Sequence, residues 1–308
     1  MIDLRSLFCI LVLLPITAIA QSSRTQIVML GTGTPIPDPD RSGPATAIIV
    51  DSVAYLFDAG TGVVRRAAAA GRNGVRAFAS RQPNGQPAPR FDRVFLTHLH
   101  SDHTMGLADV IFTPWIQGRR APLDIYGPPG TKHLVSGILD AYSEDIAERI
   151  SGSGGPSPEG WKSVVHEISA EGVVFQDSRI TVRAFPVPHA GWKYAFGYRI
   201  ETPDRTIVLS GDERPNPSIA DQCRGCDVLI HEVYSDSGFA TVPPDRQVYH
   251  ARAHTSATQL GDIATRAKPK LLILYHQLFF GASEEKLLSE VRSHFSGRVV
   301  SAHDLEVY

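Results

Sequence analysis

Residues 95–107 read FLTHLHSDHTMGL, and this stretch places three histidines and an aspartate within six residues, directly after an apolar run. A helix would spread these side chains over its surface, whereas a strand that runs into a tight turn can bring them around one point. The four side chains are His98, His100, Asp102 and His103. A histidine-rich surface turn is the alternative, but the buried-type run RVFL before it favours a metal site.

The composition is that of a globular protein with a large core. The chain has 308 residues, of which 43% are hydrophobic and 20% charged, and this size allows one or two domains. The formal charge of -2 and the pI near 6.6 show no excess of basic residues. A broad electrostatic attraction to nucleic acid or to an anionic bilayer is therefore not expected, although a local basic patch is compatible with these values.

The N-terminus has the pattern of a secretory signal. Arg5 precedes an apolar run over residues 7–16, and the small-residue signal Ala18-Ile19-Ala20 follows. The run is well short of the roughly 20 residues that span a bilayer, so residues 1–20 predict a cleaved signal peptide rather than a stable membrane anchor. A buried N-terminal strand is the weaker alternative. We expect Cys9 to leave with the peptide and the mature domain, residues 21–308, to be secreted or periplasmic.

The mature chain keeps two cysteines, Cys223 and Cys226, in a C-x-x-C arrangement. In an oxidising compartment they can form a local disulfide. Two small buried residues that lead into a strand are an equally good interpretation.

The order of apolar runs and turn residues predicts short strands interleaved with helices. Such an order suggests two sheets that face each other with helices outside, in a single domain. The glycines of GTGT are not a dinucleotide fingerprint, because the spacing differs and prolines follow. The glycine- and serine-rich residues 151–160 are a candidate mobile loop. Strands are expected near 26–30, 47–51, 55–58, 123–126, 164–168, 173–175, 180–187, 195–201, 206–210, 228–232 and 271–275, and helices near 63–70, 105–116, 132–150, 256–267 and 283–295.

The histidine cluster has the spacing H-x-H-x-D-H, and further segments accompany it: LGTGTPIPDPDRSGPATAIIVD, FPVPHA, VLSGDERP, LIHEV, AHTSATQLGDIA and LILYH. Together they resemble the metallo-β-lactamase superfamily, in its ribonuclease Z and arylsulfatase-like branch. The resemblance covers nearly all of the mature chain. It implies an α/β (α+β) fold, a four-layer αββα sandwich of two mixed sheets with helices outside, and two metal ions at the edge of the sheets.

The resemblance also implies two ligand sets joined by a carboxylate: His98, His100 and His189 around one ion, Asp102, His103 and His276 around the other, and Asp212 between them. The residues agree with this division. His189, Asp212 and His276 each follow an apolar, strand-like run, so each can project from a strand end towards a common edge.

Nitrogen and oxygen ligands without thiolates suit two Zn²⁺ ions and leave the second position tolerant of Mn²⁺ or Fe. Metals about 3.5 to 4 Å apart lower the pKa of a shared water towards about 7, which supplies hydroxide at neutral pH. We expect Asp102 both to ligate a metal and to orient that hydroxide.

Two further polar residues, His254 and Glu232, match positions where the ribonuclease Z branch places a histidine near the scissile bond and a glutamate that orients it. The leaving oxygen needs a proton or a positive donor opposite the attacking group. The local sequences are HTS and HEVY where the branch typically reads HST and HEAT. An exposed loop histidine and a solvated strand end are the alternative. We expect His231 to support the shell around the ligands, and surface or cap roles for His133, His166, His250, His294 and His303.

These observations predict a secreted, dinuclear, zinc-dependent hydrolase of a small anionic ester, either a phosphodiester or an aryl sulfate. Cleavage of tRNA precursors is the main alternative, and Arg41 lies where the ribonuclease Z branch has a basic, RNA-facing turn. Export and near-neutral charge disfavour a nucleic acid partner without excluding it. A lactonase or another metallo-hydrolase, an iron-dependent oxidoreductase and a non-catalytic binding module complete the alternatives, and a homodimer is compatible with the sequence.

Overall fold

The computed structural model describes residues 23–79, 88–152 and 155–308. The predicted signal peptide and its Cys9 lie outside these ranges, so the export prediction rests on the sequence alone. Among the described helices, none is both long and apolar enough to cross a bilayer.

The first sheet has six strands in sequence order, β1 to β6. Its first three strands are antiparallel, whereas β3 to β6 run parallel to one another. The parallel strands bring their carboxyl ends to one edge of the sheet. The strands are β1 (Thr25–Gly31), β2 (Ala45–Val50), β3 (Val53–Phe57), β4 (Arg93–Phe95), β5 (Leu123–Gly127) and β6 (Ser163–Glu167).

The second sheet has seven strands in the order β13-β12-β11-β10-β9-β8-β7. Strands β7 to β10 are antiparallel, and β10 to β13 are parallel. Aromatic and branched side chains of both sheets, such as Phe57, Phe95 and Tyr198, pack between them. The strands are β7 (Gly172–Gln176), β8 (Thr181–Pro186), β9 (Phe196–Glu201), β10 (Thr206–Leu209), β11 (Val228–Tyr234), β12 (Leu271–Leu278) and β13 (Val299–Ser301).

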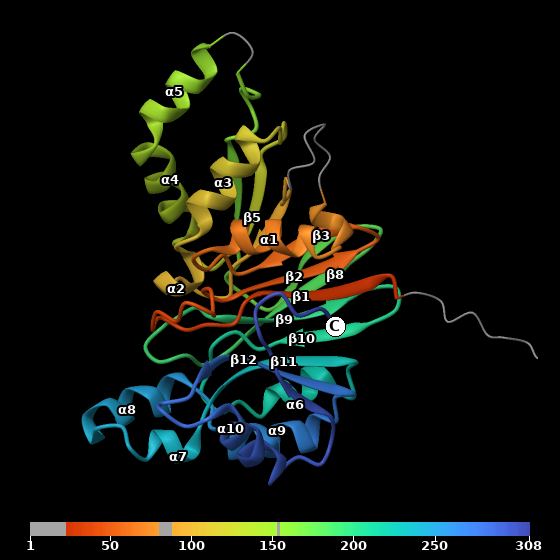
Figure 1. Cartoon of the computed structure of the whole chain (residues 1–308), viewed down its shortest axis with the longest axis vertical. Helices are drawn as coiled ribbons and strands as arrows, with labels where there is room; N and C mark the ends of the chain where they lie inside the picture. The colour runs from red at the N-terminus through yellow and green to blue at the C-terminus, as the bar shows by residue number, and fades with distance from the viewer. Residues whose placement is uncertain (1–22, 80–87, 153–154) are drawn as a thin grey trace, which may run out of the picture.

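Helices cover the outer face of each sheet, as Figure 1 shows, with α1 and α3 to α5 on one side and α6, α9 and α10 on the other. The predicted four-layer αββα sandwich is confirmed. The helices are α1 (Val63–Arg72), the 3-10 turn η1 (Arg76–Phe78), α2 (Ser101–Thr104), α3 (Leu107–Ile116), α4 (Thr131–Ala141), α5 (Ser143–Ser151), α6 (Ser218–Cys223), α7 (Asp236–Phe239), α8 (Pro244–Ala253), α9 (Ala257–Ala267) and α10 (Glu284–Arg292).

Some elements differ from the sequence prediction. The single helix expected over 132–150 is two helices, α4 and α5, which meet at Tyr142. Helix α8 was not expected, because its only buried residue is Ala253 and it therefore lacks an apolar stripe. The short strand β13 was also missed, since three residues give too little pattern to recognise.

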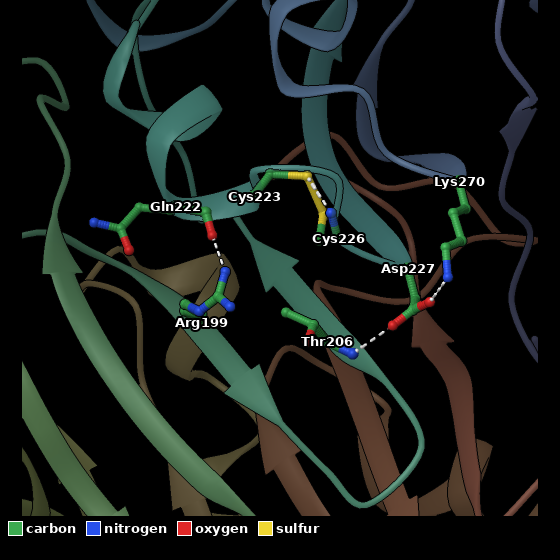
Figure 2. The surroundings of a disulfide bond; sticks show 7 residues. All are labelled: Arg199, Thr206, Gln222, Cys223, Cys226, Asp227 and Lys270. Carbon is green, nitrogen blue, oxygen red and sulfur yellow. Dashed lines mark hydrogen bonds and ion pairs between the residues drawn. A yellow bond between two sulfur atoms is a disulfide. The ribbon is translucent and has the colours of Figure 1, made fainter.

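Cys223 and Cys226 are bonded to each other at the point where α6 leads into β11 (Figure 2). Both are buried, in the apolar layer between the second sheet and its helices. Asp227, directly after the second cysteine, accepts from the Thr206 amide at 2.7 Å and pairs with Lys270 at 2.7 Å. The bridge and these contacts tie together the starts of β10, β11 and β12. The disulfide therefore belongs to the fold, at the opposite end of β11 from Glu232.

Glycines allow the turn after β3 to cross the turn before β2. A methyl group added at Gly60 would lie 2.2 Å from the carbonyl carbon of Gly43, and backbone atoms cannot move aside cheaply. This crossing places the chain between β3 and α1 beside the histidine motif, because the Gly106 amide donates to Ala59 O at 2.8 Å.

We expect Gly60→Ala to lower the free energy of unfolding by about 1–3 kcal/mol, the usual cost of forcing extra volume into a packed site. Gly137→Ala is the matched control: the glycine lies within α4 and an added methyl meets nothing within 4 Å. This control should stabilise the protein by about 0.5–1 kcal/mol. Urea denaturation measures both values, and equal stabilities for the two variants would contradict the close crossing.

Candidate metal centre

The histidine motif spans the end of β4 and the start of α2. His98 and His100 lie in the short segment between the two elements, and Asp102 and His103 belong to the single turn of α2. The motif thus places two side chains before the helix and two within it. The predicted arrangement of a strand running into a tight turn is therefore what the structure shows.

The first group of ligand atoms gathers around His100. Its Nδ1 lies 2.9 Å from His98 Nε2 and 3.1 Å from His189 Nε2. Asp212 Oδ2 is 4.0 Å from His98 Nε2. One nitrogen from each of the three histidines and one oxygen of Asp212 lie within 4.8 Å of one another, which is compact enough to surround one ion.

The second group lies on the other side of Asp212. His276 Nε2 is 3.2 Å from Asp102 Oδ2, and His103 Nε2 is 3.6 Å from the same oxygen. Asp212 Oδ2 lies 3.3 Å from His276 Nε2 and 3.4 Å from His103 Nε2. The structure thus brings together all seven residues that the sequence predicted as ligands, with Asp212 between the two groups.

A β-bulge projects His276 into the site. The pairing of β11 with β12 shifts register between Glu232 and Val233, which leaves His276 without a ladder partner. Its φ of 45° lies in the left-handed region, which is strained for a residue with a Cβ. Bulges re-aim side chains next to active sites, and here the strain is retained where it directs a ligand.

Burial and charge set different protonation states in the two groups. Burial lowers the pKa of His98 well below its ordinary value, that of His100 to about 4, and that of His189 as well, so these imidazoles are neutral, as metal binding requires. Burial opposes protonation of His103 and His276 too, but the nearby carboxylates raise both pKa values. The protons on His103 and His276 balance the buried negative charge of Asp212. A divalent cation could balance that charge instead.

The donor set fits a pair of metal ions. His103 Nε2 and Asp212 Oδ1 are buried and make no hydrogen bond. An unpaired buried polar atom is costly, and coordination to a cation would satisfy both. Six imidazole and carboxylate donors with a shared Asp212 match Zn²⁺ coordination, and sulfur donors are absent from the metal-compatible groups among the described residues.

Groups behind the ligands hold the imidazoles in place. Asp58 Oδ2 lies 2.8 Å from His103 Nδ1, and the same carboxylate accepts from the Thr97 amide at 2.8 Å. His189 Nδ1 lies 2.8 Å from Ala253 O. These contacts leave Nε2 of each ring to face the ligand groups. Asp58 was not predicted as a site residue, although its place directly after β3, in the DAGTG segment, was a usable signal.

His254 and Glu232 form a buried pair beside the metal ligands. His254 Nδ1 lies 3.2 Å from Glu232 Oε2, and Glu232 Oε1 accepts from the Thr255 amide at 2.7 Å. Burial raises the pKa of Glu232 well above its usual range and lowers that of His254 to about 4. The exposed-loop alternative for His254 does not hold, because only 6% of the residue is accessible.

His231 lies on the far side of Glu232 and is fully buried. Its Nδ1 is 2.6 Å from Glu232 O, and its Nε2 is 3.1 Å from Glu213 Oε1. Glu213 also accepts from Asn216 Nδ2 at 2.8 Å. Burial raises the pKa of Glu213, and the carboxylate raises that of His231 despite burial. His231 thus links the backbone of Glu232 to the side chain of Glu213, the residue after Asp212.

A cavity of about 610 Å³ opens above the metal ligands. His100, Asp102, Asp212, His254 and His276 contribute to its lining. Helix α8 forms another part of the wall through Arg246, Tyr249 and His250, and the segment before β2 adds Pro35 and Ile36. Helices α2 and α8, which carry part of this lining, both lie at the left of the molecule in Figure 1.

His250 was predicted to have a surface or cap role, yet it lines the cavity, and its ring centroid is 5.9 Å from that of His254. It was missed because α8 itself was missed. Three others do pair at the surface: His166 with Asp124, His294 with Asp262, and His303 with Glu284. His133 lies exposed in α4.

Residues 54–277 match the family model of the beta-lactamase superfamily domain. The chain belongs to the metallo-β-lactamase superfamily. It is 35% identical to ribonuclease Z of Mycobacterium bovis over 288 residues, which cover 91% of this chain and 96% of that protein, and 33% identical to ribonuclease Z of Mycobacterium marinum over the same shares.

Solved structures agree in fold. The metallo-β-lactamase-fold protein YhfI of Bacillus subtilis superposes with a TM-score of 0.65 at 19% identity, covering 92% of this chain and 98% of that one. The short form of human tRNase Z gives 0.64 at 23% identity with the same coverage. Family, fold and donor set together make this chain a metal-dependent hydrolase of the superfamily.

We expect Asp58→Asn to weaken metal binding by about 10- to 100-fold, the usual cost of losing the group that orients a ligating histidine. The amide keeps the shape of the carboxylate but removes its charge from His103. Chelator competition, read as metal content per chain, gives the affinity. As the control, Asp124→Asn removes the surface partner of His166 and should leave the metal affinity unchanged. Equal losses of metal affinity in both variants would contradict the role of Asp58 in orienting His103.

Proposed function

We propose that the protein is a phosphodiesterase of the ribonuclease Z type, with two Zn²⁺ ions, that cleaves RNA by hydrolysis. The observation that carries this proposal is the pair of donor groups sharing Asp212 at the floor of a cavity whose wall holds His254. Two bound metal ions would supply Lewis acidity and an activated water at neutral pH. The extensive identity to curated ribonuclease Z proteins supports RNA as the substrate.

The protein's own residues would then position the phosphodiester and move a proton. Asp102 and Asp212 line the cavity floor and hold the ligand shell in place. The His254 ring presents Nδ1 to Glu232, which leaves Nε2 as the nitrogen available to the cavity. The Nε2 proton can pass to the leaving oxygen while Nδ1 takes a proton from Glu232, whose raised pKa favours its protonated form and which also fixes the ring orientation.

A second candidate is the hydrolysis of a small anionic ester outside the cytoplasm. It rests on the predicted signal peptide and on the apolar rim of the cavity, where Ile36 is 64% exposed and Tyr249 47%. Such a rim suits an aromatic leaving group. Among esters of this kind a phosphodiester is favoured over an aryl sulfate, which the family relationship does not support.

Two observations argue against RNA contacts far from the metal centre. Arg41 is turned inward, because its guanidinium donates to Gln277 Oε1 at 2.9 Å and pairs with Glu284 at 3.3 Å, so it does not serve as a free RNA contact. Helix α5 carries Glu144 and Asp145 in its first turn, which is not the character of a basic arm. A phosphate-binding surface therefore has to lie nearer the metal centre.

The substrates can be separated directly. We expect the purified mature protein with bound Zn²⁺ to cleave a tRNA precursor at one site, and more efficiently than it cleaves bis-aryl phosphodiester or aryl sulfate, at physiological salt. His100→Ala and Asp212→Ala should abolish all turnover, whereas His294→Ala, which changes a surface histidine, should retain it. Efficient small-ester turnover without site-specific RNA cleavage would favour the second candidate. Full activity in metal-stripped protein would refute both.

His254→Ala should keep both metals and lower kcat by about 10²- to 10⁴-fold, the range expected for a lost proton donor. The metal content separates this result from a collapse of the site. His303→Ala provides the surface control. An unchanged kcat in His254→Ala would remove this residue from the mechanism.

A further inference from the structure

A second, smaller cavity of about 300 Å³ lies beside the metal centre. Its lining is Pro188, His189, Ala190, Trp192, Arg214 and Arg252. His189 connects the cavity to the metal centre. Its Nε2 joins the first ligand group, and the residue also lines the cavity. A ligand in the small cavity would therefore lie beside the first ligand group.

Backbone hydrogen bonds fix the position of both arginines. The Arg214 amide donates to Pro188 O at 2.9 Å, and the Ala190 amide donates to Arg252 O at 3.0 Å. The segments after β8 and β10 and the end of α8 thus meet around His189. The loop that carries His189 therefore holds the backbone of both arginines, and both guanidinium groups reach the same cavity.

Both arginine side chains are available to a ligand. They are exposed, and within residues 23–79, 88–152 and 155–308 neither guanidinium has a hydrogen bond or an ion pair. The cavity lining contains no carboxylate. Arg65 and Arg149 illustrate the contrast, since each pairs with an aspartate at about 3 Å. Two unpaired guanidinium groups in a concave site favour a phosphate, which they can bind through several parallel N–H bonds.

Trp192 adds an aromatic surface to the same cavity. Its Nε1 lies 2.8 Å from His100 Nε2, which places the indole against the metal centre, and 37% of the residue remains exposed. Aromatic side chains beside basic groups bind nucleotides by stacking on the base while the cations hold the backbone. A small aryl ester offers an aromatic ring but no second phosphate.

We propose that this cavity, which we name the arginine subsite, binds a nucleotide next to the scissile phosphodiester: Arg214 and Arg252 hold its phosphate and Trp192 contacts its base. The inference rests on the proposed RNA cleavage and states how the strand is held. It also explains how a chain with a formal charge of -2 can grip a polyanion, because two unpaired arginines lie together in this cavity.

The test compares Arg214→Ala/Arg252→Ala with a charge-matched control, Arg72→Ala/Arg266→Ala. The control arginines are exposed in the last turns of α1 and α9. Binding of a short single-stranded oligodeoxynucleotide to the zinc-loaded protein is followed by fluorescence anisotropy at several salt concentrations. Each neutralised phosphate contributes about 0.7 to the slope of log affinity against log salt, so loss of the arginine pair, which holds one phosphate, should flatten the slope by about 0.7.

Activity provides the second readout. In the subsite variant, kcat/KM on the tRNA precursor should fall about 10-fold or more relative to kcat/KM on bis-aryl phosphodiester, and the control should keep the wild-type ratio. Trp192→Ala should lower oligonucleotide affinity more than Trp192→Phe, with metal content measured in both. The oligonucleotide slope decides the arginine subsite, and RNA cleavage by the wild type decides the proposed function. The same slope in both double variants would overturn the subsite even if RNA is cleaved.

Discussion

The buried carboxylate of Asp212 is the constraint on which the site depends. It is 2% exposed, and a charge removed from water to this degree must be balanced nearby. Histidines from β12 and from the motif after β4 surround it, and these belong to different sheets. The strand ends of the two facing sheets must therefore come together at this edge of the sandwich. The aromatic core between the sheets, including Phe95 and Tyr198, holds them there.

Much of this arrangement could be predicted from the sequence, because ligands at strand ends leave a readable pattern. The motif of residues 98–103 and the apolar runs before His189, Asp212 and His276 each carry their own signal. The sandwich follows from the same runs. Strand ends and metal motifs are local features, and the structure brings together every ligand that they predicted.

The remaining features depend on contacts that local sequence does not encode. Asp58 acts on His103 across 45 positions of the chain. Helix α8 is largely exposed and has no apolar stripe, so Tyr249 and His250 could not be assigned to the cavity wall. The bulge at His276 arises from a register shift between two paired strands, and pairing has no signature in either strand alone.

The difference between features that local sequence encodes and features that depend on long-range contacts also bears on the choice of substrate. Most of the ligands lie on segments that the fold holds in place. The cavity walls come from α8, the segment before β2 and the loop after β8. Among these wall segments, only the loop after β8 contributes a ligand, His189. Identity of 35% to ribonuclease Z is compatible with a shared metal centre and different walls. Net charge is also an indirect guide to the substrate, because binding depends on the local arrangement of charges rather than on their sum. We therefore expect side chains such as Tyr249 and Arg252, which line the cavities above and beside the metal centre, to select the substrate.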